Sequence, residues 1–132
     1  MEGVYGFCWG GKQVIHSVKL FKAAAVVHPA FLEVSDADGI SIPFALIDSQ
    51  DEPKETMDEI YSVVEKKPFG DKCFRHRYEI FHGFCAGRAN YEDPENGKLA
   101  REVRSPFRLF HPQDSVPCFL LFFVRGECAD AL

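Results

Sequence analysis

The sequence predicts an α/β protein in which about four mostly parallel strands are flanked by helices. Short apolar runs alternate along the chain with longer segments whose apolar residues recur at helical spacing. A cysteine set between closely spaced glycines stands at the first junction between such a run and such a segment. Strands that alternate with helices favour a parallel sheet with right-handed crossovers.

The first part of the chain predicts two strands joined by a helix. Residues 4–8 form a short apolar run, and residues 10–22 carry apolar side chains at helical spacing. Residues 23–27 form a second apolar run that is typical of a buried strand and ends close to a proline. Residues 30–41 are expected to form an irregular loop.

The next part repeats this pattern. Residues 42–48 predict a third strand, and residues 54–67 predict a second amphipathic helix. Residues 69–77 are expected to be rich in turns, and the alternation over residues 78–81 indicates a last short strand. A further helix is expected over residues 92–102.

The composition changes at Val103, where proline and phenylalanine become frequent and helical periodicity is lost. We therefore expect two regions, an α/β region over residues 1–102 and an atypical Pro- and Phe-rich tail over residues 103–132. The apolar run at residues 118–124 is expected to cover part of the apolar surface of the α/β region.

The glycine-flanked cysteine resembles a nucleophile elbow, the tight turn between a strand and a helix. Gly6 and Gly10 lack a Cβ, which lets strand and helix approach while Cys8 takes a strained backbone conformation. A helix N-terminus favours the thiolate form of such a cysteine. The backbone N–H of Trp9 would then donate a hydrogen bond to a developing oxyanion.

Reactive side chains follow each predicted strand, namely Cys8, His28, the acids between Asp48 and Asp51, and His82. Sites in open parallel sheets form beyond the carboxyl ends of the strands, so these groups are expected to converge. Thiol, carboxylate and imidazole in this chain order match the nucleophile, acid and base of α/β-hydrolases. Single ligands from separate loops lack a metal signature, so no metal or other cofactor is predicted.

The individual roles follow from chemical need. His82 would accept and return the thiol proton, and Asp51 would fix the tautomer of His82. Asp48 and Glu52 are alternatives for that acid. His28 is expected to form part of the floor of the site.

The composition of the chain limits the classes of partner that it is expected to bind. The net charge of −5 argues against nucleic acid or an anionic membrane. We find no signal-peptide pattern and no apolar run of about 18 residues. Five cysteines without a C-x-x-C pair indicate reduced thiols rather than a disulfide framework. These features predict a cytoplasmic protein.

Four motifs together resemble the dienelactone hydrolase family of α/β-hydrolases. They are Gly-Phe-Cys-Trp-Gly-Gly at 6–11, His-Pro-Ala-Phe at 28–31, Ser-Gln-Asp-Glu-Pro at 49–53 and His-Gly-Phe at 82–84. The resemblance covers roughly residues 3–102. It implies a partial α/β-hydrolase fold and a hydrolase of small lactones or esters that works through a thioester acyl-enzyme.

By position, the resemblance implies a triad of Cys8, Asp51 and His82. It also implies that Arg88, which follows the histidine, helps to bind a carboxylate of the substrate. His28, in the floor of the site, is the second residue expected to contact the substrate. The family has about four strands before the elbow, so residues 1–102 would correspond to the C-terminal portion of its domain. The elbow strand would then be left at a sheet edge, which favours self-association.

Enzyme activity is left open by these departures from the family. One alternative is a truncated, catalytically incompetent homologue or gene-model fragment that lacks the substrate pocket. Another is a thiol redox sensor that uses Cys8, which is less favoured because no resolving cysteine lies nearby in sequence.

Overall fold

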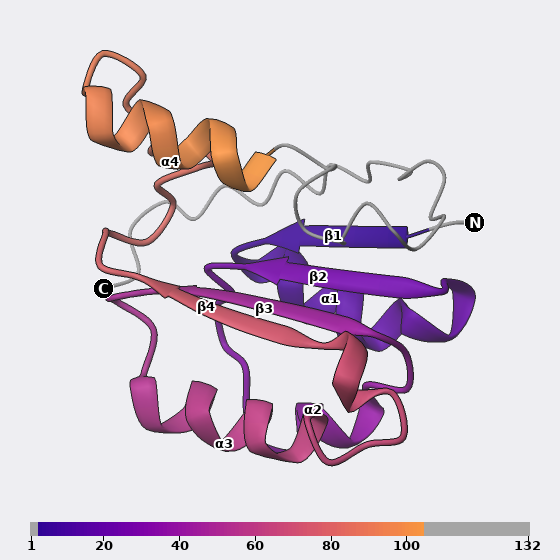
Figure 1. Cartoon of the computed structure of the whole chain (residues 1–132). Helices are drawn as coiled ribbons and strands as arrows, with labels where there is room; N and C mark the ends of the chain where they lie inside the picture. Colours follow the sequence, from indigo (N-terminus) through magenta and orange to yellow (C-terminus); the bar gives the residue numbers. More distant parts are fainter. Residues whose placement is uncertain (1–2, 105–132) are drawn as a thin grey trace.

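A computed structural model describes residues 3–104, which form a parallel sheet with helices on both faces (Figure 1). The strands are β1 (Gly3–Phe7), β2 (Ala23–Val27), β3 (Phe44–Ser49) and β4 (Phe74–Tyr78). Their order in the sheet is β1-β2-β3-β4, and each neighbouring pair is parallel. The predicted α/β class with about four parallel strands is confirmed. The predicted tail beyond residue 104, with its apolar run at 118–124, lies outside the described residues.

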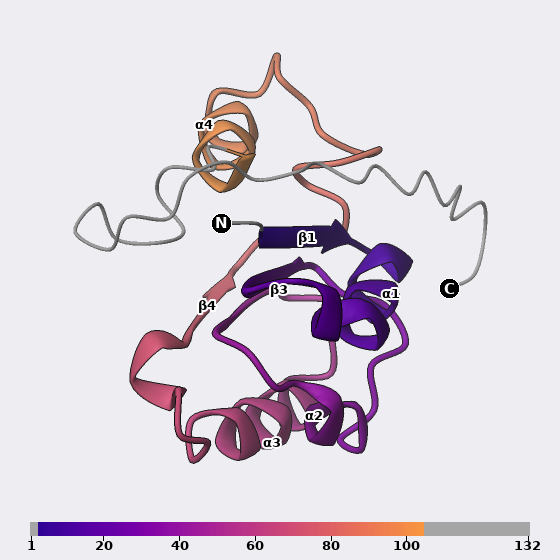
Figure 2. The ribbon, with the colours of Figure 1, turned by 90° about the vertical axis from the view of Figure 1, so that its right-hand side faces the viewer.

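The helices lie on opposite faces of the sheet. The α-helices are α1 (Trp9–Ser17), α2 (Asp36–Gly39), α3 (Lys54–Val64) and α4 (Pro94–Arg104), with single 3-10 turns at Val18–Leu20 and Gly70–Lys72. Helices α1, α2 and α3 cover one face, and α4 lies over the other, as the two orthogonal views agree (Figures 1 and 2). Helix α2 falls within the segment that was expected to be an irregular loop.

Apolar side chains cover both faces of the central strands, as is typical of parallel sheets. Toward α1, α2 and α3 the sheet contributes Val4, Ala24, Val26, Phe44 and Leu46. On the other face, Val27 and Ile47 pack with Phe84, Cys85 and residues of α4. The continuous apolar runs in the sequence therefore reflect burial on two sides.

The last strand lies earlier than the sequence predicts. The prediction placed it at residues 78–81 and assigned turns to residues 69–77, whereas β4 spans Phe74–Tyr78. The sequence pattern did not indicate this strand because Arg75 and Arg77 are charged, and charged residues at alternate positions are typical of a solvent-exposed segment. In the fold both arginines bind the buried carboxylate of Asp48 on the neighbouring strand.

Backbone hydrogen bonds continue beyond the ends of the strands and bring the following residues together. Cys8 donates its N–H to Val27 O at 3.1 Å, and His28 donates its N–H to Ile47 O at 2.7 Å. Strand β1 is at one edge of the described sheet, as expected. The residues that follow β1, β2 and β3 therefore share one end of the sheet.

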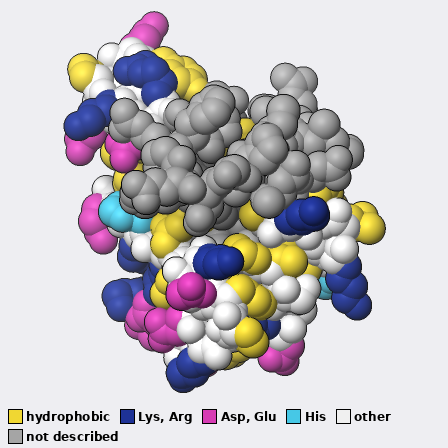
Figure 3. All heavy atoms as spheres, turned by 45° about the vertical axis from the view of Figure 1, so that its right-hand side comes forward, with side chains coloured by type: hydrophobic (Ala, Val, Ile, Leu, Met, Phe, Trp, Pro, Cys, Tyr) yellow, Lys and Arg dark blue, Asp and Glu magenta, His cyan; other side chains and the backbone are white. Residues whose placement is uncertain are grey.

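Acidic and basic side chains are interspersed on the face shown in Figure 3. Within the described part of the chain, no helix has the length and apolar character needed to cross a bilayer.

Gly6 provides a test of the close approach between β1 and α1. A Cβ at Gly6 would lie 2.9 Å from Gly11 N and closer still to the carbonyl of Gly10. We expect Gly6→Ala to lower the free energy of unfolding by more than 1 kcal/mol, because a backbone clash cannot be relieved by a side-chain rotation (about 1–3 kcal/mol for overpacking). Chemical denaturation measures this. Gly87→Ala is the control, since nothing lies within 4 Å of a Cβ there; equal effects of the two substitutions would contradict the prediction.

Candidate functional site

Cys8 occupies a strained turn between β1 and α1. Its φ of 53° and ψ of −128° fall in a region that non-glycine residues rarely adopt. Its carbonyl accepts hydrogen bonds from Gly11 N and Ala30 N, both at 3.0 Å. The backbone of Cys8 is therefore fixed by a donor within α1 and by a donor from the loop after β2, and its side chain is half-buried at the start of α1.

Trp9 is the first residue of α1 and is 40% exposed. Its amide belongs to the N–H groups at a helix start that have no acceptor within the helix. An amide in this position, next to the cysteine, can donate to a negative oxygen that forms beside Cys8. The predicted oxyanion role of Trp9 stays a prediction.

His82 lies in the loop after β4 and bonds both the thiol and a carboxylate. Its Nδ1 is 2.7 Å from Glu52 Oε1, and its side chain is hydrogen-bonded to Cys8. The hydrogen bond to Cys8, followed by the bond to Glu52, raises the pKa of His82 to about 9, while burial opposes the shift. Nδ1 is occupied by Glu52, which leaves Nε2 as the ring nitrogen available to the thiol.

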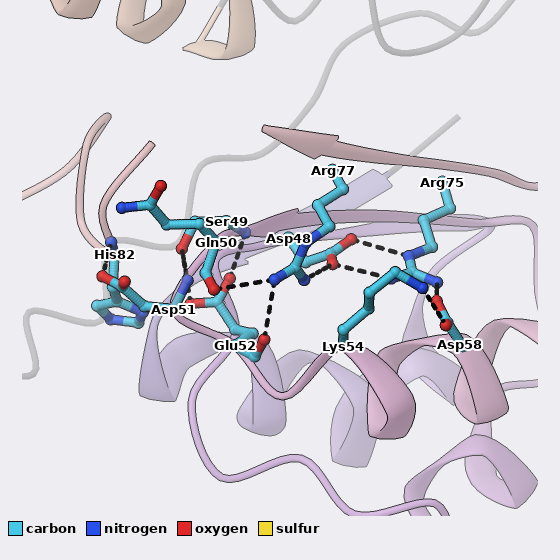
Figure 4. Close-up of polar contacts among 10 residues, drawn as sticks. All are labelled: Asp48, Ser49, Gln50, Asp51, Glu52, Lys54, Asp58, Arg75, Arg77 and His82. Atoms are coloured by element: carbon cyan, nitrogen blue, oxygen red, sulfur yellow. Dashed lines mark hydrogen bonds and ion pairs between the residues drawn. The ribbon is translucent and has the colours of Figure 1, made fainter. Parts of the chain in front are cut away.

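The acid that bonds the imidazole is Glu52 rather than the predicted Asp51. The exposed Asp51 side chain accepts a hydrogen bond from the backbone N–H of His82, with Oδ2 at 2.7 Å. Asp51 therefore hydrogen-bonds the backbone of the loop that carries the imidazole, whereas Glu52 hydrogen-bonds the ring itself (Figure 4). Asp48, the other alternative, faces Arg75 and Arg77 instead.

The turn after β3 explains why Glu52 and not Asp51 reaches the ring. The carboxylate of Glu52 folds back to accept the N–H and, at 3.0 Å, the hydroxyl of Ser49. This leaves the buried carboxylate oriented toward His82. A serine followed three residues later by a glutamate is the spacing of a capping box, and that spacing is the sequence signal for Glu52.

His28 lies against the ring of His82 at the end of β2. The ring centroids are 4.8 Å apart in an edge-to-face arrangement, and Phe7 and Phe84 flank the other sides of His28. Burial, with a smaller contribution from His82, lowers the pKa of His28 to about 3, so its imidazole is neutral. The side chain is fully buried, and within residues 3–104 neither ring nitrogen has a hydrogen-bond partner.

Arg88 lies near the site but outside its hydrogen-bonded chain. Its guanidinium lies 5.3 Å from the centre of the Phe81 ring, next to His82 in sequence. The side chain is exposed. Gly83, with a φ of 85°, allows the turn that folds Arg88 back, since a Cβ at Gly83 would lie 3.2 Å from Arg88. Its predicted contact with substrate stays a prediction.

The described residues contain no cluster of three or more histidine, cysteine or acidic side chains that could hold a metal ion. The neighbouring ionic groups are instead neutralised by arginine. Asp48 is fully buried and receives two hydrogen bonds from Arg75, each at 2.9 Å, and one from Arg77 at 2.6 Å. This ion-pair cluster lies beside the candidate site (Figure 4).

Two curated relatives match this chain, and both are from the fission yeast Schizosaccharomyces pombe. The uncharacterized AIM2 family protein C977.15 is 36% identical over 99 residues, and the uncharacterized AIM2 family protein C30D10.14 is 31% identical over 99 residues. Each match covers 73% of this chain and 40% of the relative, so the chain spans about two fifths of their length. No protein-family model and no solved structure matches it.

These relatives correct the function predicted from the sequence. Both are named as AIM2 family proteins, and neither is named as a dienelactone hydrolase. The prediction of a dienelactone hydrolase-type enzyme that cleaves small lactones or esters through a Cys-Asp-His triad is therefore wrong. Its alternative, a catalytically incompetent fragment, is not shown either.

Glu52 and Asp51 make different contacts with His82, so their substitution should affect the pKa of His82 differently. We expect Glu52→Gln to move the pKa of His82 from about 9 toward its ordinary value of 6.5, because a neutral amide supports the imidazolium less well. Asp51→Asn is the matched control, because it keeps an oxygen acceptor for the backbone N–H of His82 and leaves the hydrogen bond between Glu52 and the ring in place. Proton–carbon NMR of the imidazole measures both values. A larger change in the Asp51 variant would contradict the assignment.

The same pKa gives a pH dependence of stability. The folded state raises the pKa of His82, so its stabilising contribution is complete below about pH 6.5 and is lost as pH rises through about 9. We expect the free energy of unfolding to fall across that interval, with a smaller fall in His82→Gln. Denaturation at a series of pH values is the measurement, and equal slopes in both proteins would exclude this contribution.

Proposed function

We propose that Cys8, His82 and Glu52 form a nucleophilic-cysteine site for covalent catalysis at an activated carbonyl group of a small molecule. The observation that carries this proposal is the hydrogen-bonded chain from thiol to imidazole to buried carboxylate. Nucleophile, base and orienting group within hydrogen-bond reach are the signature of an activated nucleophile. The strained backbone of Cys8 at a helix start supports the same reading.

The chemistry follows from these contacts. The raised pKa of His82 favours a resting pair in which the imidazolium carries the proton of the Cys8 thiol, and the thiolate attacks the carbonyl carbon to form a C–S bond. Glu52 holds the ring orientation and stabilises the imidazolium. As the bond to the leaving group breaks, His82 gives its proton to that group. A second nucleophile then removes the acyl group by the reverse steps, with its proton returning through His82 to Cys8.

Three further residues are assigned contacts with the reactant in this proposal. The Trp9 amide would donate to the developing oxyanion, and a loss of one such donor costs about 2.7–4 kcal/mol of barrier. His28 would offer a neutral N–H beside His82, which its unpartnered ring nitrogens support. Arg88 would face an anionic part of the reactant, which its exposed position over Phe81 supports.

The proposal extends to the cellular compartment, the family and the partner of the protein. Cys8, Cys73 and Cys85 are all outside disulfide bonds, which suits a reducing compartment such as the cytoplasm. The identity to the two fission-yeast proteins supports placing the chain in the AIM2 family. The partner is a small molecule, and the interspersed surface charges in Figure 3 are consistent with this choice over nucleic acid.

A small aryl thioester tests the reaction class, because acyl transfer to Cys8 releases an aryl thiolate that is measured by absorbance. We expect one acyl group per chain by intact-mass spectrometry, located on Cys8 by peptide mapping. Cys8→Ser should abolish this acylation, and His82→Gln should slow it by about a hundredfold or more, the scale of a positioned general base (about 10²–10⁴). Acylation spread evenly over Cys8 and Cys73 would refute the proposal.

His28 is tested by separating stability from reactivity. We expect His28→Leu to leave the free energy of unfolding unchanged or about 1 kcal/mol higher, because it removes buried polar atoms without partners. Acylation by the thioester should slow in the same variant. His76→Leu, at an exposed position of β4, is the control and should change neither quantity. A stability loss in His28→Leu with an unchanged acylation rate would assign His28 to packing alone.

A further inference from the structure

Arg77 connects the edge strand β4 to the turn that carries Glu52. Its Nη1 donates to Asp48 Oδ2 at 2.6 Å, and its Nη2 donates to two main-chain carbonyls of the turn. Those carbonyls are Gln50 O at 2.9 Å and Glu52 O at 3.2 Å. Figure 4 shows the guanidinium between Asp48 and the turn. One side chain therefore fixes the main chain at Glu52 relative to the sheet.

The position of Arg77 is determined by the register of the sheet. Asp48 and Arg77 are paired across β3 and β4. The carboxylate of Asp48 is fully buried, so it requires cationic partners close by. Arg75, two residues earlier on β4, donates to both oxygens of Asp48 and also to Asp58, and none of its side-chain hydrogen bonds within residues 3–104 goes to the turn. Both arginines thus bind Asp48, but Arg75 also binds Asp58 whereas Arg77 also binds the turn.

Glu52 is held from two sides. Its carboxylate is bound by the Ser49 N–H and hydroxyl, and its carbonyl is bound by Arg77. With the backbone and the carboxylate both fixed, Oε1 is presented to His82 Nδ1 at 2.7 Å. Hydrogen bonds of this kind set the orientation of a catalytic group before the reactant binds.

From these contacts we propose that Arg77 is a positioning residue for the candidate nucleophile, acting through the turn at Glu52 on the imidazole of His82. The inference rests on the proposed function of Cys8 and His82. Among the described residues, the side chain of Arg77 donates to Asp48 and to the carbonyls of Gln50 and Glu52, so we expect its effect to reach the site through those carbonyls. Arg75 lacks this connection and serves the ion-pair cluster alone.

The test compares Arg77→Gln with Arg75→Gln in the full chain. Each substitution removes a cation from Asp48, so both are expected to lower stability, but only Arg77→Gln removes the donors to the turn. We expect Arg77→Gln to slow acylation of Cys8 by the aryl thioester about ten- to a hundredfold, the scale of a displacement near 1 Å. The pKa of His82, measured by NMR, should move from about 9 toward 6.5 in this variant and remain unchanged in Arg75→Gln.

Arg77→Lys keeps a cation beside Asp48 but lacks the forked guanidinium that bridges it to the two carbonyls. It should therefore retain the stability of the parent while showing the slower acylation, and it decides the question if Arg77→Gln does not fold. Equal effects of the Arg75 and Arg77 variants, or parent-like acylation in Arg77→Lys, would overturn the inference. His82→Gln separates the two proposals. If His82→Gln is acylated as fast as the parent, the proposed function is wrong. If His82→Gln is acylated slowly while the Arg77 variants react like the parent, only the role of Arg77 is wrong.

Discussion

The buried carboxylate of Asp48 is the constraint that links the sheet to the candidate site. A carboxylate with no solvent contact requires charged partners, and loss of one partner from a buried pair costs about 3–5 kcal/mol. Both partners, Arg75 and Arg77, come from β4, so the charge fixes this edge strand beside β3. Arg77 extends the same hydrogen bonding to the turn after β3, and Glu52 in that turn reaches His82. The register of an edge strand and the orientation of the imidazole thus depend on one ionic cluster.

Much of the fold could be predicted because apolar runs mark strands that are buried on both faces. The predicted second strand has the bounds of β2, and the glycines of the elbow indicated the strand-to-helix turn at Cys8. Strand β4 escaped prediction because its two arginines gave it the pattern of a surface segment. Their partner is Asp48, nearly thirty residues earlier in the chain. A pattern read over neighbouring residues contains no information about such a contact.

The sequence indicates which loops come together at the candidate site, but not which side chains in those loops bond each other. Chain order predicts that a thiol, an acid from the turn after β3 and the imidazole of His82 lie together, because the carboxyl ends of parallel strands meet at one edge. The structure brings Cys8, Glu52 and His82 within hydrogen-bonding reach. The choice among three acids depended on how a short turn folds. Asp51 and Glu52 both contact His82, one at its backbone and one at its ring, and only the closure of Glu52 onto Ser49 separates them. Sequence order alone cannot distinguish these contacts.

Strained backbone and buried polar atoms without hydrogen-bond partners occur at the same end of the sheet, whereas the turn after β3 is extensively hydrogen-bonded. Cys8 and His28 both have positive φ values, and the buried ring of His28 has no hydrogen-bond partner among residues 3–104. By contrast, Glu52 is bonded at its carboxylate and at its carbonyl. Conformations of this kind persist only where the surroundings over-determine them, and they cluster at functional sites. The well-bonded turn holds the base in place, and the two strained residues are the one that carries the thiol and the one that packs against the imidazole. This division argues for a site organised for reaction rather than for stability alone.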